Sequence, residues 1–103
     1  MAEGNIDWGK ITQLSGFRGI DASSMDILRK NIASHERRIG ELAKKIEELH
    51  ITLKPVHERE KGEKYEVHVR LIDNGKVYAS KVTERNLFLA VDESLNKITN
   101  EMD

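Results

Sequence analysis

Residues 65–98 constrain the fold more than any other part of the chain, because they combine two strand patterns, a tight turn and a helix pattern. Residues 65–72 alternate apolar and polar side chains, which is the period of a strand with one covered face. An Asn-Gly pair at residues 74–75 favours a type I′ turn, in which both central residues take a positive φ. We therefore predict a β-hairpin in which Asp73 pairs with Lys76.

A helix pattern follows this hairpin. Asn86 is suited to be its N-cap, since the side-chain oxygen of asparagine accepts a hydrogen bond from a backbone N–H of the first turn. Apolar side chains then recur at helical spacing. They are Leu87, Val91, Leu95, Ile98 and Met102.

A longer apolar stripe precedes the hairpin, in alternating steps of three and four residues. It predicts a long helix over residues 25–49, with a capping box of Ser23 and Asp26 at its start and Gly40 as a weak point. The spacing is also typical of a coiled coil, but the strand patterns downstream favour a helix packed on a sheet. The stripe consists of Met25, Leu28, Ile32, His35, Ile39, Leu42, Ile46 and Leu49.

The rest of the chain completes a single domain. We predict a first strand within residues 11–17, a second at 50–56 and a charged loop at 58–64, with residues 1–10 as a flexible leader. The predicted order over residues 11–103 is β-α-β-β-β-α. This order indicates an α+β two-layer sandwich, in which two helices cover one face of a four-stranded, mainly antiparallel sheet and leave the other face open.

Composition narrows the classes of function. The chain has 103 residues, no cysteine and a net charge of −1. Without cysteine there are no disulfides and no thiolate chemistry, and no apolar run is long enough to cross a membrane, so we expect a cytoplasmic protein. The near-neutral charge argues mildly against nucleic-acid binding, but lysines and arginines gathered on one face would be sufficient for it.

The sequence contains no catalytic or metal-binding pattern. Gly16 and Gly19 lack the lysine of a phosphate-binding loop, and the glutamates of residues 58–64 lie in a solvated stretch. We expect no enzyme, no cofactor and no metal site. The four histidines, which have neither HxxxH nor HExxH spacing, are His35, His50, His57 and His68.

Basic side chains are the remaining candidates for a site. One group lies on the first predicted helix outside its stripe, and another lies on the open sheet face. Either could follow phosphates, although the interleaved glutamates are also typical of a solvated helix face. The aromatic residues fall on core faces, so RNA would be bound through its backbone and shape. The helix group is Arg29, Lys30, Arg37, Arg38, Lys44 and Lys45, and the sheet group is Lys54, His68, Arg70 and Lys81.

Residues 74–80, Asn-Gly-Lys-Val-Tyr-Ala-Ser, resemble the turn and strand of the ribosome hibernation promoting factor family, also called ribosome-associated translation inhibitors. Residues 50–54 resemble the second strand of that family. Further matches on the two helices are Leu28, Arg29, Ile32, Arg38, Ile39, Leu42 and Ile46, and then Asn86, Phe88, Ala90 and Val91.

This resemblance covers nearly the whole chain after residue 10 and implies the same β-α-β-β-β-α order. It also implies a non-enzymatic stress-response factor that docks on the small ribosomal subunit, occupies the mRNA/tRNA channel and silences translation. Family members use helix lysines and arginines against ribosomal RNA, and Arg29, Arg38 and Lys97 match such positions. The last helix departs from the family because it ends without a basic run.

Two other functions stay open. A protein–protein interaction module of the same fold would form a weak homodimer through the long first helix and would not bind RNA. A stand-alone binder of double-stranded RNA is the third hypothesis, because an α-β-β-β-α order is embedded in the chain. Residues 86–90, however, carry no charge at the start of the last helix.

Overall fold

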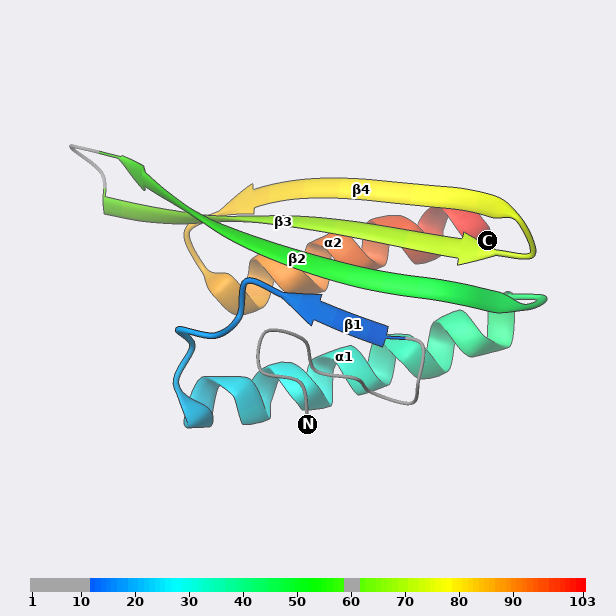
Figure 1. The fold of residues 1–103 in the computed structure, drawn as a ribbon, viewed down its shortest axis with the longest axis horizontal. Helices are drawn as coiled ribbons and strands as arrows, with labels where there is room; N and C mark the ends of the chain where they lie inside the picture. Colours follow the sequence, from blue (N-terminus) through cyan, green and yellow to red (C-terminus); the bar gives the residue numbers. More distant parts are fainter. Residues whose placement is uncertain (1–11, 59–61) are drawn as a thin grey trace.

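In the computed structural model, two helices cover one face of a four-stranded sheet, and no described helix or strand covers the other face (Figure 1). The structure describes residues 12–58 and 62–103. It confirms the predicted order and the α+β sandwich. The elements are β1 (Thr12–Ser15), α1 (Ala22–Leu42), β2 (Ile46–Glu58), β3 (Gly62–Asp73), β4 (Lys76–Glu84) and α2 (Leu87–Met102).

The strands lie in the order β1-β2-β3-β4, and the sheet is mixed. Among the described strands, only the edge pair β1 and β2 is parallel, while the two other pairs are antiparallel. The predicted hairpin is confirmed, since Asp73 pairs with Lys76 across a turn in which Asn74 and Gly75 both have a positive φ, of 51° and 87°. The backbone twist of this turn matches the twist of the strands it joins.

The first helix is shorter than the sequence predicted. It ends at Leu42, and both Ile46 and Leu49 belong to β2. The β2–β3 register shifts between Ile46 and Glu48, which is a β-bulge. An extra residue in a strand reverses the side to which the following residues point. The bulge therefore lets Ile46 and Leu49, which are three residues apart, both point toward the core. The three-residue step that we read as a helix is therefore accommodated in a strand.

The start of α1 also differs from the prediction. Asp21, not Ser23, is the N-cap, and its carboxylate accepts a hydrogen bond from the backbone N–H of Ser24 at 3.0 Å. This hydrogen bond lowers the pKa of the Asp21 carboxyl below its usual value. The N-cap of α2 is confirmed as Asn86, which accepts from the N–H of Leu89.

The predicted loop and leader can be compared with the structure only in part. Of the predicted loop at residues 58–64, both ends are strand, because β2 extends to Glu58 and β3 begins at Gly62. The predicted leader at residues 1–10, Ile11 of the predicted first strand and residues 59–61 lie outside the described residues. None of the helices in the described part of the chain is long and apolar enough to cross a membrane.

One apolar core fills the space between the helices and the covered face of the sheet. From α1, the stripe residues Met25, Leu28, Ile32 and Ile39 are buried in it. Because these residues are buried in the core of the domain, the stripe cannot form the seam of a coiled coil. The sheet contributes Leu14, Leu49, Ile51, Leu53, Val67, Val69, Leu71 and Val82, and α2 contributes Leu87, Ala90, Val91, Leu95 and Ile98.

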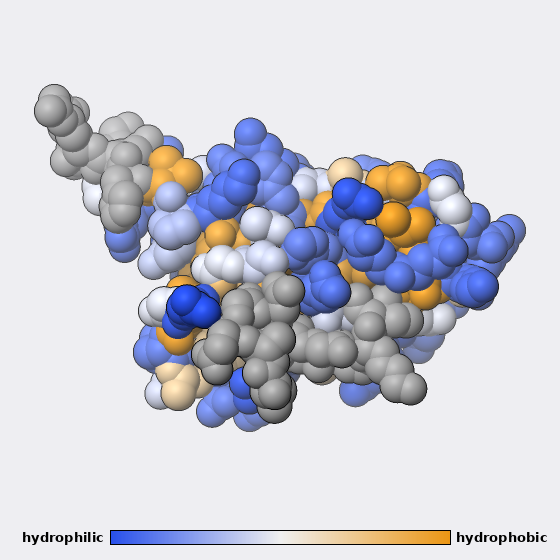
Figure 2. Space-filling model, in the orientation of Figure 1, coloured by the Kyte–Doolittle hydropathy of each residue, from blue (hydrophilic) through white to orange (hydrophobic). Residues whose placement is uncertain are grey.

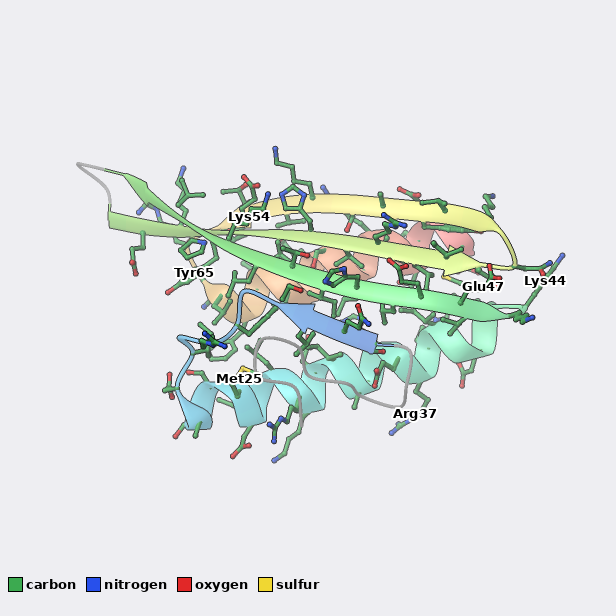
Figure 3. All side chains as sticks on the ribbon, viewed as in Figure 1. Met25, Arg37, Lys44, Glu47, Lys54 and Tyr65 are labelled. Atoms are coloured by element: carbon green, nitrogen blue, oxygen red, sulfur yellow. The ribbon has the colours of Figure 1, made fainter. Side chains whose placement is uncertain are left out.

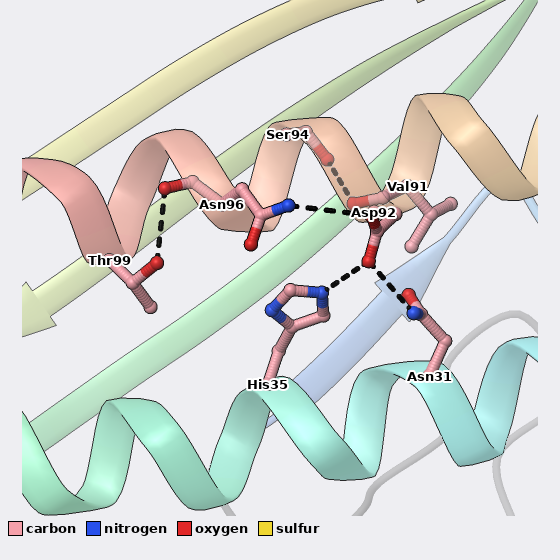
Figure 4. A network of polar contacts seen from close by, with 7 residues as sticks. All are labelled: Asn31, His35, Val91, Asp92, Ser94, Asn96 and Thr99. Carbon is pink, nitrogen blue, oxygen red and sulfur yellow. Dashed lines mark hydrogen bonds and ion pairs between the residues drawn. The ribbon is translucent and has the colours of Figure 1, made fainter.

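A polar network joins α1 to α2 beside this core (Figure 4). The carboxylate of Asp92 accepts hydrogen bonds from Asn31 Nδ2 at 2.9 Å and from His35 Nε2 at 2.7 Å. These two hydrogen bonds lower the pKa of the Asp92 carboxyl, with that from Asn31 the larger cause. The His35 side chain is 12% exposed, so the histidine in the stripe is a residue of the helix interface.

Candidate nucleic-acid interface

The open face of the sheet brings together basic side chains from three strands. Lys54 on β2 pairs with Glu66 on β3, and Lys81 on β4 pairs with His68 on β3. Arg70 lies two residues from His68, so all of these side chains share one face. The strands, rather than any continuous stretch of sequence, therefore place Lys54, Arg70 and Lys81 on a common surface.

A shallow hollow of about 330 Å³ lies on this face, next to Arg70. Its lining includes His50 and Thr52 from β2, His68 and Arg70 from β3, and Ala79 from β4. Ala79 pairs directly with Arg70, and its small side chain leaves the space above β4 unfilled. We call the surface formed by Lys54, Arg70, Lys81, His50 and His68 the basic sheet face.

Two carboxylates on the same face hold two of these side chains. Glu48 lies 3.3 Å from Nε of Arg70, and Glu66 accepts a hydrogen bond from Nε2 of His68. The hydrogen bond from His68 lowers the pKa of the Glu66 carboxyl, and the charges of Lys81 and Lys54 act in the same direction. The basic sheet face is therefore a mixed surface with a positive excess, and Arg70 keeps a side chain that is 59% exposed.

The two histidines of the basic sheet face, His50 and His68, lie close together. Because Thr52 pairs with His68 and His50 pairs with Arg70, the histidines are diagonal neighbours on adjacent strands and line the same hollow. Nε2 of His50 also shares a hydrogen bond of 2.7 Å with Oγ of Ser15 on β1. Within residues 12–58 and 62–103, no three His, Asp or Glu side chains are grouped so as to hold a metal ion.

The basic residues of α1 form a separate group, on the outer side of the helix layer. Arg37 points away from the sheet, far from Lys54 (Figure 3). Acids accompany this group, since Arg29 lies 3.9 Å from Asp26, and Arg38 lies 3.6 Å from Asp103. The exposed members of the group are Arg29, Lys30, Arg37 and Arg38.

Lys44 and Lys45 do not extend the α1 group, because both lie in the turn between α1 and β2. Their backbone N–H groups donate to the buried carboxylate of Asp73, at 3.0 Å and 2.7 Å. This contact ties the turn to the β3–β4 hairpin and leaves Lys44 at the end of the molecule (Figure 3). Lys76, which the sequence analysis did not consider as a candidate, opens β4 at the same hairpin and is exposed.

Lys97 lies beside the basic sheet face rather than beside α1. Its Nζ is 3.5 Å from the backbone oxygen of Lys81, so it covers part of the edge of β4. Elsewhere α2 is acidic, with Asp92, Glu93 and Glu101. The tertiary structure thus divides the predicted basic residues among three surfaces, and only the basic sheet face gathers them from several strands.

Most of the surface in the view of Figure 2 is hydrophilic, with apolar side chains exposed towards the β3–β4 hairpin. Val77, which is 58% exposed, lies near this end of β4.

The aromatic residues Tyr65, Tyr78 and Phe88 pack against the core, as predicted. Lys76 Nζ lies 4.9 Å from the ring centroid of Tyr78. The basic sheet face therefore offers charges, hydroxyl groups and two imidazoles, rather than the larger rings of Phe, Tyr or Trp, for contact with RNA.

A comparison with solved structures finds the N-terminal domain of Protein Y from Thermus thermophilus, with a TM-score of 0.54 and 14% sequence identity. The match covers 81% of this chain and 82% of that domain. At this sequence identity the match shows that the two proteins share a fold. No family model matches the sequence, and no curated protein matches it.

Proposed function

We propose that this protein is a cytoplasmic, ribosome-associated factor that binds RNA of the small subunit and silences translation by occupying the mRNA/tRNA channel. One observation carries the proposal: a fold shared with Protein Y presents Lys54, Arg70 and Lys81 together on its open sheet face. The basic sheet face makes the main contact with the RNA. The helix residues Arg29 and Arg38, whose role comes from the family resemblance, make a second contact.

The chemistry of the basic sheet face fits the RNA backbone better than the bases. Lysine and arginine bind phosphates through charge, and this binding weakens steeply as salt rises, because counterions are released from the RNA. Contacts of this kind position a protein on RNA without reading its sequence. Folded ribosomal RNA would accordingly be recognised by the shape of its backbone, with no base inserted into the protein.

Co-sedimentation with purified small subunits tests the proposal. We expect binding at low salt that weakens as salt is raised, and protein bound beforehand should prevent the subunit from taking up mRNA and tRNA. The variant K54Q/R70Q/K81Q should lower the affinity at least about tenfold and reduce the salt slope by about 2, because two to three phosphate contacts are lost. Absence of binding at low salt would contradict the function.

A charge-matched variant on α1 separates the two surfaces. R29Q/K30Q/R38Q removes the same number of positive charges from exposed positions of the helix. We expect it to weaken binding less than the sheet variant does. A larger loss for the helix variant would move the main contact to α1, where the family resemblance places it, and would leave ribosome association intact.

The interaction-module hypothesis gains no specific support from the structure. The apolar stripe that was to drive self-association is buried against the sheet and α2. A weak homodimer would have to use another surface, and sedimentation equilibrium over a range of protein concentrations would detect it.

A further inference from the structure

We propose that the hollow on the basic sheet face binds a phosphate group and that protonation of His50 and His68 strengthens this binding. The inference rests on the proposed function and deepens it. It names the phosphate of the RNA backbone as the group held at the hollow, and it adds acidification as the condition that increases affinity.

The geometry of the hollow suits a phosphate. Its volume of about 330 Å³ is open to solvent above β2, β3 and β4, and the small side chain of Ala79 keeps one side unfilled. Arg70 supplies a guanidinium beside it, and Thr52 supplies a hydroxyl. Guanidinium and imidazolium groups donate strong, charge-assisted hydrogen bonds to phosphate oxygens. Three donor types therefore converge on one shallow site.

The histidines are placed so that protonation adds donors next to Arg70. A neutral imidazole carries one N–H, and its unperturbed charge change falls near pH 6.5. Nε2 of His68 is directed at Glu66, and Nε2 of His50 is directed at Ser15. These contacts orient both rings. When a ring is protonated on acidification, both of its nitrogens become N–H donors and the ring gains one positive charge.

The charged groups facing the two histidines decide how large this effect is. These charged groups lie on β2, β3 and β4. The strand β1 contributes the hydroxyl of Ser15 but no charged side chain. Among the described strand residues beside the histidines, three basic groups stand against two carboxylates, which is an excess of one positive charge, and protonation of both histidines raises this excess to three. The groups are Glu48 and Lys54 on β2, Glu66 and Arg70 on β3, and Lys81 on β4.

The lowered pKa of the Glu66 carboxyl keeps this acid ionised at the pH where imidazoles titrate, so Glu66 opposes anion binding throughout that range. Removing it together with Glu48 should therefore strengthen binding at every pH. This gain of function would not follow if Glu48 and Glu66 served only to stabilise the strands.

Sodium tripolyphosphate is a suitable probe, because it presents phosphates without ribosomal RNA. NMR of the histidine ring protons between pH 5 and 8, against sodium chloride at matched ionic strength, measures the titration midpoints. We expect the midpoints for His50 and His68 to rise by about 0.5 pH unit in tripolyphosphate, because an anion that prefers the protonated ring stabilises it. His35, held between the helices by Asp92, is an internal control that should not respond. Unchanged midpoints at both sheet histidines would overturn the proposal.

Fluorescence anisotropy with a short single-stranded RNA provides the second arm. At constant ionic strength the wild-type protein should bind about three- to tenfold more tightly at pH 6.0 than at pH 7.8, which is about threefold for each histidine. The variant H50Q/H68Q should lose this response, and E48Q/E66Q should bind more tightly at both pH values. E101Q removes an exposed acid from α2 and serves as the control, which should leave the affinity unchanged at both pH values.

The outcomes separate the inference from the proposed function. RNA binding that is equal at the two pH values, or a pH response that survives in H50Q/H68Q, would overturn the role of the histidines while leaving RNA binding intact. Failure to bind ribosomal subunits at any pH would contradict the proposed function alone. In that case the tripolyphosphate titration still decides whether the hollow binds phosphate.

Discussion

The carboxylate of Asp92 on α2 lies 2.7 Å from Nε2 of His35 on α1, and this polar contact joins the two helices beside an apolar core. Asn31, one turn before His35, donates to the same carboxylate oxygen. Because the three residues come from two helices, their contact depends on how the helices pack and not on local sequence.

Replacing Asp92 should therefore destabilise the protein. We expect Asp92→Ala to lower the free energy of unfolding by about 1–2 kcal/mol, since His35 and Asn31 would lose their acceptor at a partly buried interface. Urea denaturation followed by circular dichroism measures this change. The exposed Asp26→Ala on α1 is the control and should have little effect. Equal losses in the two variants would show that the network contributes nothing.

Stability should also depend on pH through Asp92. Its pKa is lowered in the folded state, so the charged carboxylate stabilises the fold above the ordinary aspartate pKa of about 3.9, and this contribution disappears as pH falls through the lower, folded value. We expect the wild-type free energy of unfolding to fall below about pH 4 more steeply than that of Asp92→Asn. Urea unfolding at pH 3, 4 and 6 compares the two proteins. Parallel pH profiles would contradict the assignment.

Gly16 should tolerate no side chain. Its φ is +85°, and a Cβ placed there would lie 2.1 Å from the backbone oxygen of Leu53 in the central strand β2. Gly16→Ala should cost about 2–4 kcal/mol, from backbone strain and displacement of a paired strand. Gly19→Ala is a matched control, because nothing lies within 4 Å of its Cβ. Thermal unfolding of the two variants should differ clearly, and similar midpoints would refute the clash.

Gly40→Ala should have the opposite sign. Gly40 lies within α1, near its end, and is exposed, and nothing lies within 4 Å of the position that a Cβ would take. Alanine is favoured over glycine in helices by about 1 kcal/mol, so we expect a gain in unfolding free energy of about 0.5–1 kcal/mol. Urea denaturation would detect it, and a loss of stability would mean that the end of α1 needs the flexibility of glycine.

The sequence predicted the elements with local signals well. The Asn74–Gly75 turn, the pairing of Asp73 with Lys76 and the N-cap at Asn86 are all in place. Each of these features depends on residues close together in the chain, where turn chemistry and side-chain period act directly. The predicted end of the first helix was wrong, because the spacing of Ile46 and Leu49 fits a helix and, with a bulge, also fits a strand.

The candidate site was predictable only in its parts. Lys54, Arg70 and Lys81 were expected on the open face, because strand alternation assigns a side to each residue. The approach of His50 to His68 depends on the β2–β3 register, which is set by pairing across the sheet and by the bulge. Lys44 and Lys45 were predicted in the helix but lie in a turn, where their backbone N–H groups donate to Asp73, a residue far along the chain.

The sequence by itself therefore determined the order of the elements and the β3–β4 hairpin with the facing of its residues, since these follow from local periodicity and backbone preference. Only the tertiary structure decided which basic residues share a surface, how two histidines meet at one hollow, and how Asp92 holds α1 to α2. The physical reason is that these relationships join residues distant in the chain. Their positions are fixed by strand register and helix packing, which no local pattern records.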